Sequence, residues 1–356
     1  MAQWQRIGYA IVCVKKERVT VQEIARLAGV APSTVSRALR SHPSIPAQTR
    51  QRIEEIARKS GYRPDPLISA LLERRYKRTA REVDVIAYVT PQEEHLWRRS
   101  YFHACAYRGA EEQALKRGYR LEHFPLTAPG MNGRRLSRIL YHRGIQGVLI
   151  APLGRPYQRI NLDWEHFSCA TIGYSLIRPS LHRVCPHYFH NMFLALRSLR
   201  HMQCRRIASI LTDNMSKRNG QMLLSAITLH RHLYSKAAFP LFNASAYTER
   251  ETARAAIGKW LETQRFDAVF GVGTLPVMLL KPTPLVPEGI VLAAMGKSSP
   301  HDPWPVLDQK PEVVGAAAID VIIGQIQRNE RGIPEHPKVV MVEGVWEPAS
   351  PLAVPS

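Results

Sequence analysis

RVTVQEIARLAGVAPSTVSRAL, residues 18–39, decides how the N-terminal part of the chain folds. Thr20 precedes an apolar-periodic run and Glu23 follows three residues later, which favours a helix start because the hydroxyl can cap the first free amides. Gly29 suits the left-handed conformation that ends a helix. Pro32 is tolerated in the first turn of a second helix. The stretch therefore predicts two short helices joined by a tight turn.

The second of these helices presents small polar side chains outward. Val35 and Leu39 point back to the first helix. The outer face carries hydroxyls and one arginine, namely Ser33, Thr34, Ser36 and Arg37. Hydroxyls and amides bond phosphates, and an arginine can make a bidentate contact to a guanine edge. The pattern favours a helix that enters a DNA major groove; the alternative is two ordinary packed helices with a solvated face.

Short motifs spread over about sixty residues resemble the DNA-binding signature of lactose-repressor-type (LacI/GalR) transcription regulators. They are Val19-Thr20, Glu23-Ile24-Ala25, Ala28-Gly29-Val30, Thr34-Val35-Ser36-Arg37, Thr49-Arg50 and Gly61-Tyr62-Arg63-Pro64. The resemblance implies that Pro32, Ser33 and Arg37 face bases. It implies backbone contacts for Thr20, Thr34, Ser36, Arg40 and Arg50. Ala31 and Arg40 stand where the family usually has serine and asparagine, so base preference does not transfer by analogy.

A third helix is predicted over residues 46–60, followed by a stiff proline-containing connector. Residues 67–76 form a further short helical pattern. In the family this segment is a hinge helix that inserts a leucine into the minor groove, and Leu71 matches that position. The usual alanine and arginine of the motif are absent, and the alternative is that Leu67, Leu71 and Leu72 pack between domains.

The basic charge of the chain is concentrated around these helices. The 356 residues carry a formal charge of +20. Residues 15–78 hold 15 Lys and Arg against 6 Asp and Glu, whereas residues 79–356 hold 33 against 23. A polyanionic partner is favoured, and the location favours DNA.

Cysteine usage and hydropathy indicate the cytoplasm. Five cysteines are an odd number and form no Cys-x-x-Cys pair, so reduced thiols are the simplest reading. The apolar run at residues 8–14 has no signal-cleavage arrangement, and no stretch approaches the roughly 18 apolar residues of a membrane helix. No membrane association is expected, and residues 1–17 are interpreted as a poorly ordered extension.

From residue 83 onward, strands and helices alternate. Expected strands are 83–90, 147–153, 169–174, 206–212, 268–272, 290–296 and 338–345, mostly continuous apolar runs of the buried parallel type. Expected helices are 102–116, 136–142, 191–202, 222–232, 248–263 and 313–329. The predicted fold is an all-α helix-turn-helix domain followed by a two-lobed α/β domain with doubly wound parallel sheets, which resembles the family's periplasmic-binding-protein-like domain.

The expected domain boundaries follow from this alternation and the resemblance. They are an extension at 1–17, a helix-turn-helix domain at 18–64, a hinge at 65–81, an effector-binding and dimerisation domain at 82–350 and a tail at 351–356. Lobe 1 is expected to hold 82–182 and 309–332, and lobe 2 to hold 183–308 and 333–350. The three lobe crossings are expected near Arg183, near residues 299–308 and near residues 332–337.

The effector pocket is the part of the protein that the sequence predicts least clearly. The family commonly has an Asp or Asn at the end of a second-lobe strand, whereas this chain has Gly271-Val272-Gly273-Thr274 there. The effector-site candidates are Trp97, Arg218, Gly273, Trp304 and Asp308, although each alone is more often structural. An aromatic face and a carboxylate suit a sugar ring, but the missing acidic pair weakens that expectation.

Enzyme motifs are not found. The sequence lacks a complete dinucleotide fingerprint, a Gly-x-Ser-x-Gly elbow and a phosphate-binding loop, and no nucleophile and base stand together. The histidines, such as His182, His187 and His190, have no cysteine or acidic partner at ligand spacing. We expect no catalytic residue, no cofactor and no metal site.

The sequence therefore predicts a cytoplasmic regulator, a homodimer that reads a near-palindromic double-stranded operator and responds to a small-molecule effector, with carbohydrates among the candidates. Lobe closure would alter the dimer geometry presented to the hinges. The alternative is an α/β small-molecule-binding protein or enzyme with an incidental basic N-terminal segment.

Overall fold

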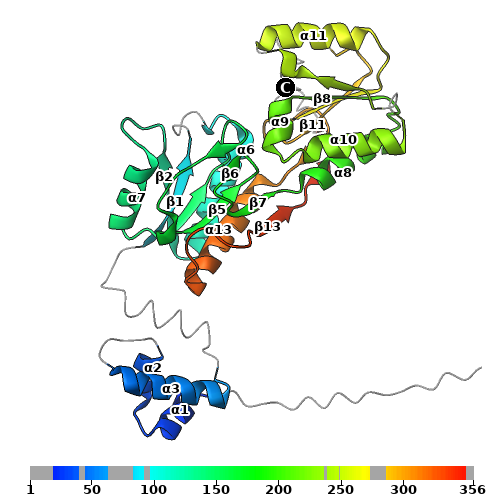
Figure 1. The fold of residues 1–356 in the computed structure, drawn as a ribbon. Helices are drawn as coiled ribbons and strands as arrows, with labels where there is room; N and C mark the ends of the chain where they lie inside the picture. Colours follow the sequence, from blue (N-terminus) through cyan, green and yellow to red (C-terminus); the bar gives the residue numbers. More distant parts are fainter. Residues whose placement is uncertain are drawn as a thin grey trace, which may run out of the picture. The chain divides into compact units, whose positions relative to one another are not determined.

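A computed structural model describes residues 19–39, 45–62, 83–91, 97–235, 239–247, 249–272 and 286–349. The chain divides into two compact units, residues 1–81 and 82–356. Figure 1 shows the helices labelled α1, α2 and α3 in the first unit, and sheets flanked by helices in the second.

The first unit is a helical cluster held together by a small apolar core. Its helices are α1 (Val21–Ala28), α2 (Pro32–Ala38) and α3 (Ala47–Ser60). Thr20 Oγ1 accepts a hydrogen bond from the Glu23 amide at 3.3 Å, and Gly29 adopts φ 63° just after α1. The predicted cap and helix stop are therefore confirmed. Arg52 of α3 donates to the carbonyl of Ala28 at 2.7 Å, which satisfies one free carbonyl at the end of α1.

The second unit contains two six-stranded sheets, one in each lobe. The first has the order β13 (Val339–Val342), β7 (His182–Pro186), β5 (Ser168–Ile172), β3 (Gly147–Ile150), β1 (Asp84–Thr90) and β2 (Tyr119–Pro125), all parallel. The second has the order β14 (Val345–Glu347), β12 (Val306–Asp308), β11 (Val291–Met295), β10 (Ala268–Val272), β8 (Ile207–Leu211) and β9 (Leu241–Asn243). Its pairs are parallel except the antiparallel pair of β12 and β14.

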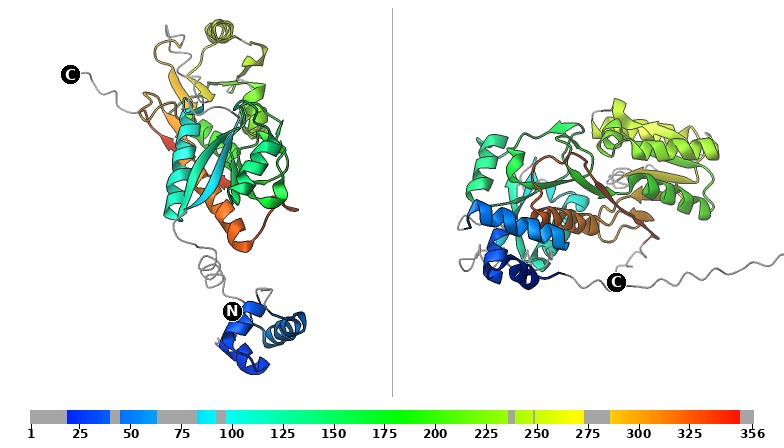
Figure 2. Two further views of the ribbon diagram at one scale, coloured as in Figure 1. Left: turned by 90° about the vertical axis from the view of Figure 1, so that its left-hand side faces the viewer. Right: turned by 60° about the horizontal axis from the view of Figure 1, so that its bottom comes forward.

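Helices cover both faces of each sheet (Figures 1 and 2). In the first lobe, α6 (Tyr101–Lys116) and α13 (Pro311–Arg328) share one core with the sheet, and α7 (Gly133–His142) shares the other with the 3-10 turn η1 (Trp164–His166). In the second lobe, α8 (Tyr188–His201) and α10 (Met222–Leu233) pack on one face and α11 (Arg250–Glu262) on the other. Smaller elements are α9 (Asp213–Arg218), η2 (Ala244–Ala246), β4 (Gln158–Arg159) and β6 (Leu176–Arg178). The predicted fold class is confirmed.

Two of the three lobe crossings differ from the expected positions. The whole of β7 pairs within the first sheet, so the first crossing follows Pro186 rather than Arg183. The expected strand 338–345 is two strands: β13 extends the first sheet beside β7, and β14 belongs to the second. The third crossing therefore lies at Glu343 and Gly344, not at 332–337. A Cβ on Gly344 would lie 2.6 Å from the Asp308 carbonyl oxygen, so the crossing needs a residue without a side chain.

The helices α6 and α13 cross at two glycines. A Cβ built on Gly109 would overlap the backbone carbonyl of Glu312, and one built on Gly315 would overlap that of Ala106. The two backbones are therefore in direct contact. This contact fixes α13, the helix that follows the second connection between the lobes, against α6 of lobe 1.

His230 of α10 is fully buried among aromatic rings. Phe193, Tyr234 and Phe239 surround it with ring centroids 4.0 to 5.5 Å away, and neither of its ring nitrogens has a hydrogen-bond partner. Burial lowers the pKa of His230, because the imidazolium would lose its hydration; the Ala226 carbonyl opposes this lowering and the charge of Arg200 adds to it. Burial also lowers the pKa of His182, and that of His103 to about 4.

These histidines predict a loss of stability in mild acid. The unfolded chain protonates near pH 6.5, whereas the folded chain resists protonation, so the free energy of unfolding falls as the pH drops below that value. We expect the fall between pH 7 and 5 to be about 1 to 2 kcal/mol smaller in His230→Leu than in the wild type. Urea unfolding at several pH values measures it. His336→Leu, at a side chain 88% exposed, is the control and should keep the wild-type slope; equal slopes in all three proteins would contradict the prediction.

Candidate DNA-reading helix and effector site

Helix α2 presents the residues expected to face bases. Pro32, Ser33 and Arg37 are exposed, while Val35 and Ala38 are buried against α1 and α3. Within the described part of the chain, Arg37 makes no ion pair. Its guanidinium is therefore available for a bidentate contact with a base edge.

The residues expected at the DNA backbone lie around this helix. Thr34 and Ser36 are half-buried on α2, Arg50 is half-buried in the first turn of α3, and Thr20 is exposed. Ala31 caps α2 without a side-chain hydrogen bond, which is the consequence expected from its departure from the family pattern. Arg40, Leu71 and Gly273 lie outside the described residues.

The two tryptophans expected at the effector site are buried instead. Trp97 is 3% exposed in the core of the first lobe, where its ring packs against Tyr107 with centroids 5.0 Å apart and its indole N–H donates to His123 Nε2 at 3.3 Å. Trp304 is 8% exposed and packs beside Ala294 and Val306. Neither offers a ring face to a ligand. Their burial has a simple cause, since large aromatic rings gain more by burial than by exposure.

Asp308 is also engaged within the fold. Its carboxylate lies 2.8 Å from Lys310 Nζ and 3.5 Å from Lys297 Nζ, and Glu347 lies 3.1 and 2.7 Å from the same two lysines. We call these four residues the crossing clamp, because Lys310 lies at the second lobe crossing and Glu347 follows the third. Burial alone would raise the pKa of Asp308, but hydrogen bonds from Lys310 and both lysine charges hold it below its usual value.

Neutralising Asp308 should therefore destabilise the protein. In Asp308→Asn, Lys297 and Lys310 share only Glu347, and two partly buried ammonium groups lose part of their compensation. After allowance for partial exposure, we expect a loss of about 1 to 3 kcal/mol in the free energy of unfolding by urea. The control is Glu335→Gln, at a side chain 90% exposed. An equally small change in both variants would show that the clamp contributes little.

Arg218 is a predicted effector residue whose side chain lacks a partner in the described chain, and the indole Nε1 of Trp304 also has no hydrogen-bond partner. Arg218 ends α9, and its Nε is buried with no hydrogen-bond partner. Burial lowers the pKa of Arg218, and the only opposing influence is the Tyr188 hydroxyl. Its charge contributes, after burial, to the lowered pKa of His103, so α9 of lobe 2 lies near the start of α6 of lobe 1.

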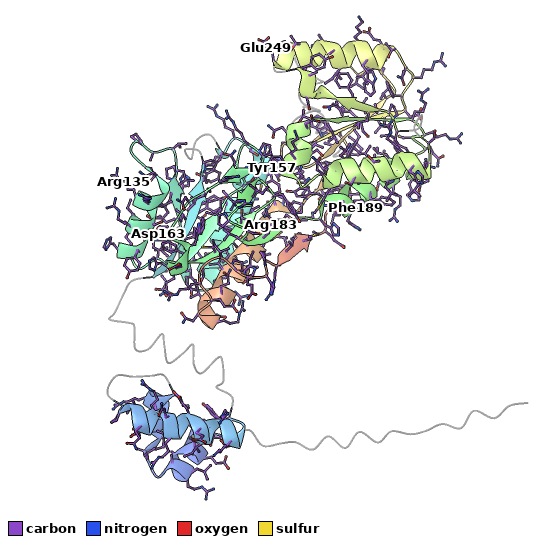
Figure 3. All side chains as sticks on the ribbon, in the orientation of Figure 1. Arg135, Tyr157, Asp163, Arg183, Phe189 and Glu249 are labelled. Carbon is purple, nitrogen blue, oxygen red and sulfur yellow. The ribbon has the colours of Figure 1, made fainter. Side chains whose placement is uncertain are left out.

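Several residues at this lobe junction were missed by the sequence reasoning. Tyr174 follows β5 of lobe 1, and its ring lies 3.3 Å from where a Cβ of Gly220 in lobe 2 would be. Arg183 of β7, labelled in Figure 3, stacks on Tyr174 at 4.5 Å and donates to the carbonyls of Gly173 and Leu176. The signal that could have found Arg183 was its place in an otherwise apolar segment near the expected crossing.

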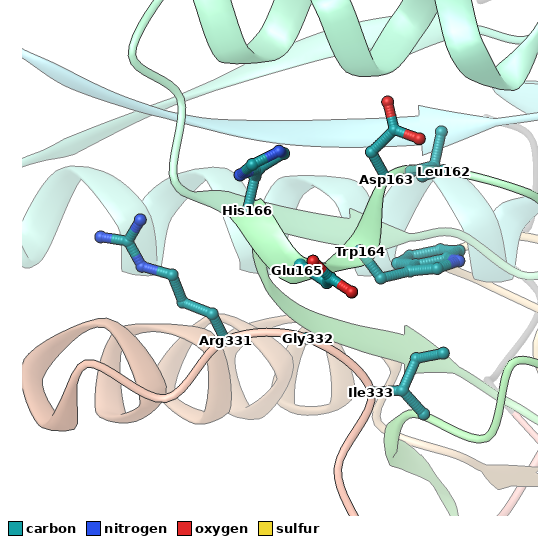
Figure 4. A pocket seen from close by; sticks show the side chains of 8 residues that line it. All are labelled: Leu162, Asp163, Trp164, Glu165, His166, Arg331, Gly332 and Ile333. Carbon is teal, nitrogen blue, oxygen red and sulfur yellow. The ribbon is translucent and has the colours of Figure 1, made fainter.

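A separate surface pocket of about 760 Å³ lies in the first lobe, between η1 and the segment after α13. Figure 4 shows His166 and Arg331 at one end and Trp164 and Ile333 at the other. Asp163 and Glu165 also line it, so charges of both signs are mixed there. The lining shows no group of one chemical kind directed at a common point.

Neither a membrane span nor a metal cluster is found in the part of the chain that the structure describes. No helix there is long and apolar enough to cross a membrane. No group of three or more His, Cys, Asp or Glu residues is placed to hold a metal ion. Cys105, Cys169, Cys185 and Cys204 are buried free thiols.

Residues 20–65 match the sequence profile described as bacterial regulatory proteins, lacI family. The N-terminal segment belongs to the LacI family. This LacI-family segment contains α1, α2 and α3, so the exposed face of α2 and the family match coincide. The resemblance inferred from the short motifs is confirmed.

Longer alignments connect this chain to named regulators. It is 25% identical over 142 residues to the NTD biosynthesis operon regulator NtdR of Bacillus subtilis (40% of each chain). It is 23% identical over 135 residues to the HTH-type transcriptional regulator MalR of Streptococcus pneumoniae (37% of this chain, 38% of MalR). The chain thus spans about two fifths of the length of these relatives.

Solved structures share the fold over nearly the whole chain. A transcriptional regulator CelR–cellobiose complex has a TM-score of 0.54 at 18% identity and covers 94% of this chain and 99% of its own. The lac repressor dimer bound to operator and the anti-inducer ONPF has a TM-score of 0.52 at 13% identity and covers 95% and 100%. At these identities the likeness establishes the fold alone.

Proposed function

We propose that this protein is a sequence-specific DNA-binding transcription regulator whose operator affinity is set by a small-molecule effector. The observation that carries the proposal is the outer face of α2. Pro32, Ser33 and Arg37 are exposed there on a helix whose inner face is fixed by Val35 and Ala38. Such a helix can be inserted into a major groove without unfolding any part of its domain.

We further propose a homodimer on a near-palindromic operator, acting in the cytoplasm where the chromosome lies. A helix of seven residues reads few base pairs, and two-fold symmetry doubles the number read. The lac repressor, whose fold this chain shares, was solved as a dimer on operator DNA. The charge of +20 adds an attraction to phosphates that does not depend on sequence.

The effector is proposed to bind between the two lobes, near Arg218. The lobes are joined by three crossing segments, so a ligand that contacts both lobes favours one angle between them. A changed angle alters the spacing of the two DNA-binding units in a dimer and hence the fraction of molecules able to hold both half-sites.

Random-sequence selection followed by footprinting tests the proposal with the full chain. We expect enrichment of a near-palindromic site and its protection at a salt concentration at which random DNA is released. Equal affinity for selected and random DNA at moderate salt would overturn it. A thermal-shift screen of small molecules, repeated with the selected DNA, then shows whether a stabilising compound also changes operator affinity.

A further inference from the structure

Arg218 has hydrogen-bond donors that the fold does not use. Its Nε is buried without a partner, and within the described chain its guanidinium makes no hydrogen bond and no ion pair. A neighbouring arginine behaves differently, since Arg183 gives its donors to the carbonyls of Gly173 and Leu176. Arg183 therefore stabilises the backbone at the junction, whereas the donors of Arg218 are available for a ligand.

Among the described residues, none brings a negative charge to Arg218. Tyr188 is buried, which raises the pKa of its hydroxyl and keeps it neutral. The pKa of His103 is lowered to about 4, so this imidazole is neutral at pH 7. The lobe junction near Arg218 is thus a polar region with an uncompensated positive charge.

Two described carboxylates in this part of the fold, Asp308 and Glu312, already pair with other cations. The charges of Asp308 and Glu312 add to the effect of burial in raising the pKa of Tyr101, which lies two residues before His103. Asp308 belongs to the crossing clamp, and Glu312 Oε1 lies 2.5 Å from Arg108 NH2. A neutral sugar is usually held by free carboxylate or amide oxygens that accept from its hydroxyls, and these two carboxylates are not free.

We propose that the effector carries an anionic oxygen group, a carboxylate or a phosphate, that binds Arg218. The inference rests on the proposed function, because it names the class of ligand for the same lobe junction. A guanidinium matches the planar pair of oxygens of either group and forms two charge-assisted hydrogen bonds with it. Taking an unpaired charge out of water is unfavourable, so an anion that pairs with Arg218 recovers energy that a neutral ligand cannot.

The test measures thermal unfolding of the full chain without DNA, at one ionic strength and pH 7.5. The salts are sodium chloride, sodium phosphate and sodium malonate, which supply no oxyanion, a phosphate and a carboxylate. We expect phosphate or malonate to raise the unfolding midpoint by about 3 °C relative to chloride at saturating concentration. Phosphate alone indicates a phosphorylated effector, and malonate alone indicates a carboxylic acid.

Two variants separate this site from general anion effects on a basic protein. In Arg218→Met, which keeps an apolar stem, the rise should disappear, and the midpoint in chloride should be at or above that of the wild type. In Arg197→Met, at an exposed arginine of α8, the rise should persist. The inference is overturned if neither anion raises the wild-type midpoint, if the rise survives in Arg218→Met, or if Arg218→Met is several degrees less stable in chloride.

The outcome is distinguishable from failure of the proposed function. If the chain selects an operator but shows no anion effect that depends on Arg218, the proposed function stands and the anionic effector is ruled out. A chain that binds anions at Arg218 but protects no operator retains the ligand site and loses the regulator.

Discussion

Replacing Arg37 by alanine is expected to reduce discrimination at one operator position by about 1 to 3 kcal/mol, while the helix itself remains folded. Arg37 is exposed, has no ion pair within the described chain and lies one residue before the buried Ala38. Its removal therefore costs the contact with the base edge and little else. Titration of the selected operator and of single-base variants, at one salt concentration, measures the change.

Arg50→Ala is the matched comparison. Arg50 lies in the first turn of α3 and not on α2, the helix expected to face the bases, so it is expected to contact phosphate. Its loss should weaken binding to every sequence about equally and reduce the salt dependence of binding by roughly one phosphate contact. If both variants lost discrimination at the same base pair to the same extent, the proposed division between base and backbone contacts would be wrong.

The second large effect is expected at the crossing of α6 and α13. Gly315→Ala adds one methyl group where the backbone carbonyl of Ala106 already lies, and the amide of Ala110 is 2.9 Å away. Neither group can rotate aside, so the two helices have to separate. We expect the free energy of unfolding to fall by about 2 to 3 kcal/mol, as found for overpacked cores.

Gly324→Ala makes the same chemical change on the same helix. A Cβ there meets only the Arg328 side chain, whose guanidinium nitrogen at 3.1 Å can move into solvent. Because alanine is the better helix former by up to about 1 kcal/mol, this variant should be neutral or stabilised. Urea unfolding of both proteins measures the contrast, and equal changes would show that the close crossing is not a constraint.

The helix-turn-helix segment could be predicted in detail because its determinants are local. Thr20, Gly29 and Gly61 act on the backbone within a few residues of themselves, and the structure places each at the helix end expected for it. The exposed face of α2 follows from the helical period alone. The buried strand β10 was predicted to the residue for a similar reason, since its run of apolar residues is continuous.

Elements at the edges of the sheets were harder to predict. Strand β2 was not predicted, because its sequence Tyr-Arg-Leu-Glu-His-Phe-Pro alternates charged and apolar residues. That alternation fits an edge strand, and the pairing of β2 with β1 is what identifies it. Strands β13 and β14 form one nearly continuous apolar stretch in the sequence. They belong to different lobes because β13 pairs with β7 of the first sheet and β14 pairs with β12 of the second.

The candidate effector site depended on tertiary structure that no local pattern contains. Trp97, Trp304 and Asp308 have side chains suited to a sugar, yet the fold buries the two rings and pairs the carboxylate. Arg218 was chosen instead from the resemblance to the family, and its Nε, like the indole Nε1 of Trp304, is left without a hydrogen-bond partner. The difference arises from which residues of distant segments arrive beside each side chain.

The crossing clamp has a consequence for the flexibility of the protein in solution. Lys310 and Glu347 lie beside segments that join the lobes, and their side chains are 32% and 33% exposed, so dissolved ions reach them. Added salt therefore weakens the ion pairs of the crossing clamp and lowers the resistance of the lobe junction to bending. Salt also weakens the attachment of a basic protein to nucleic acid, so under the proposed function one change in salt concentration would alter both the lobe junction and the binding of DNA.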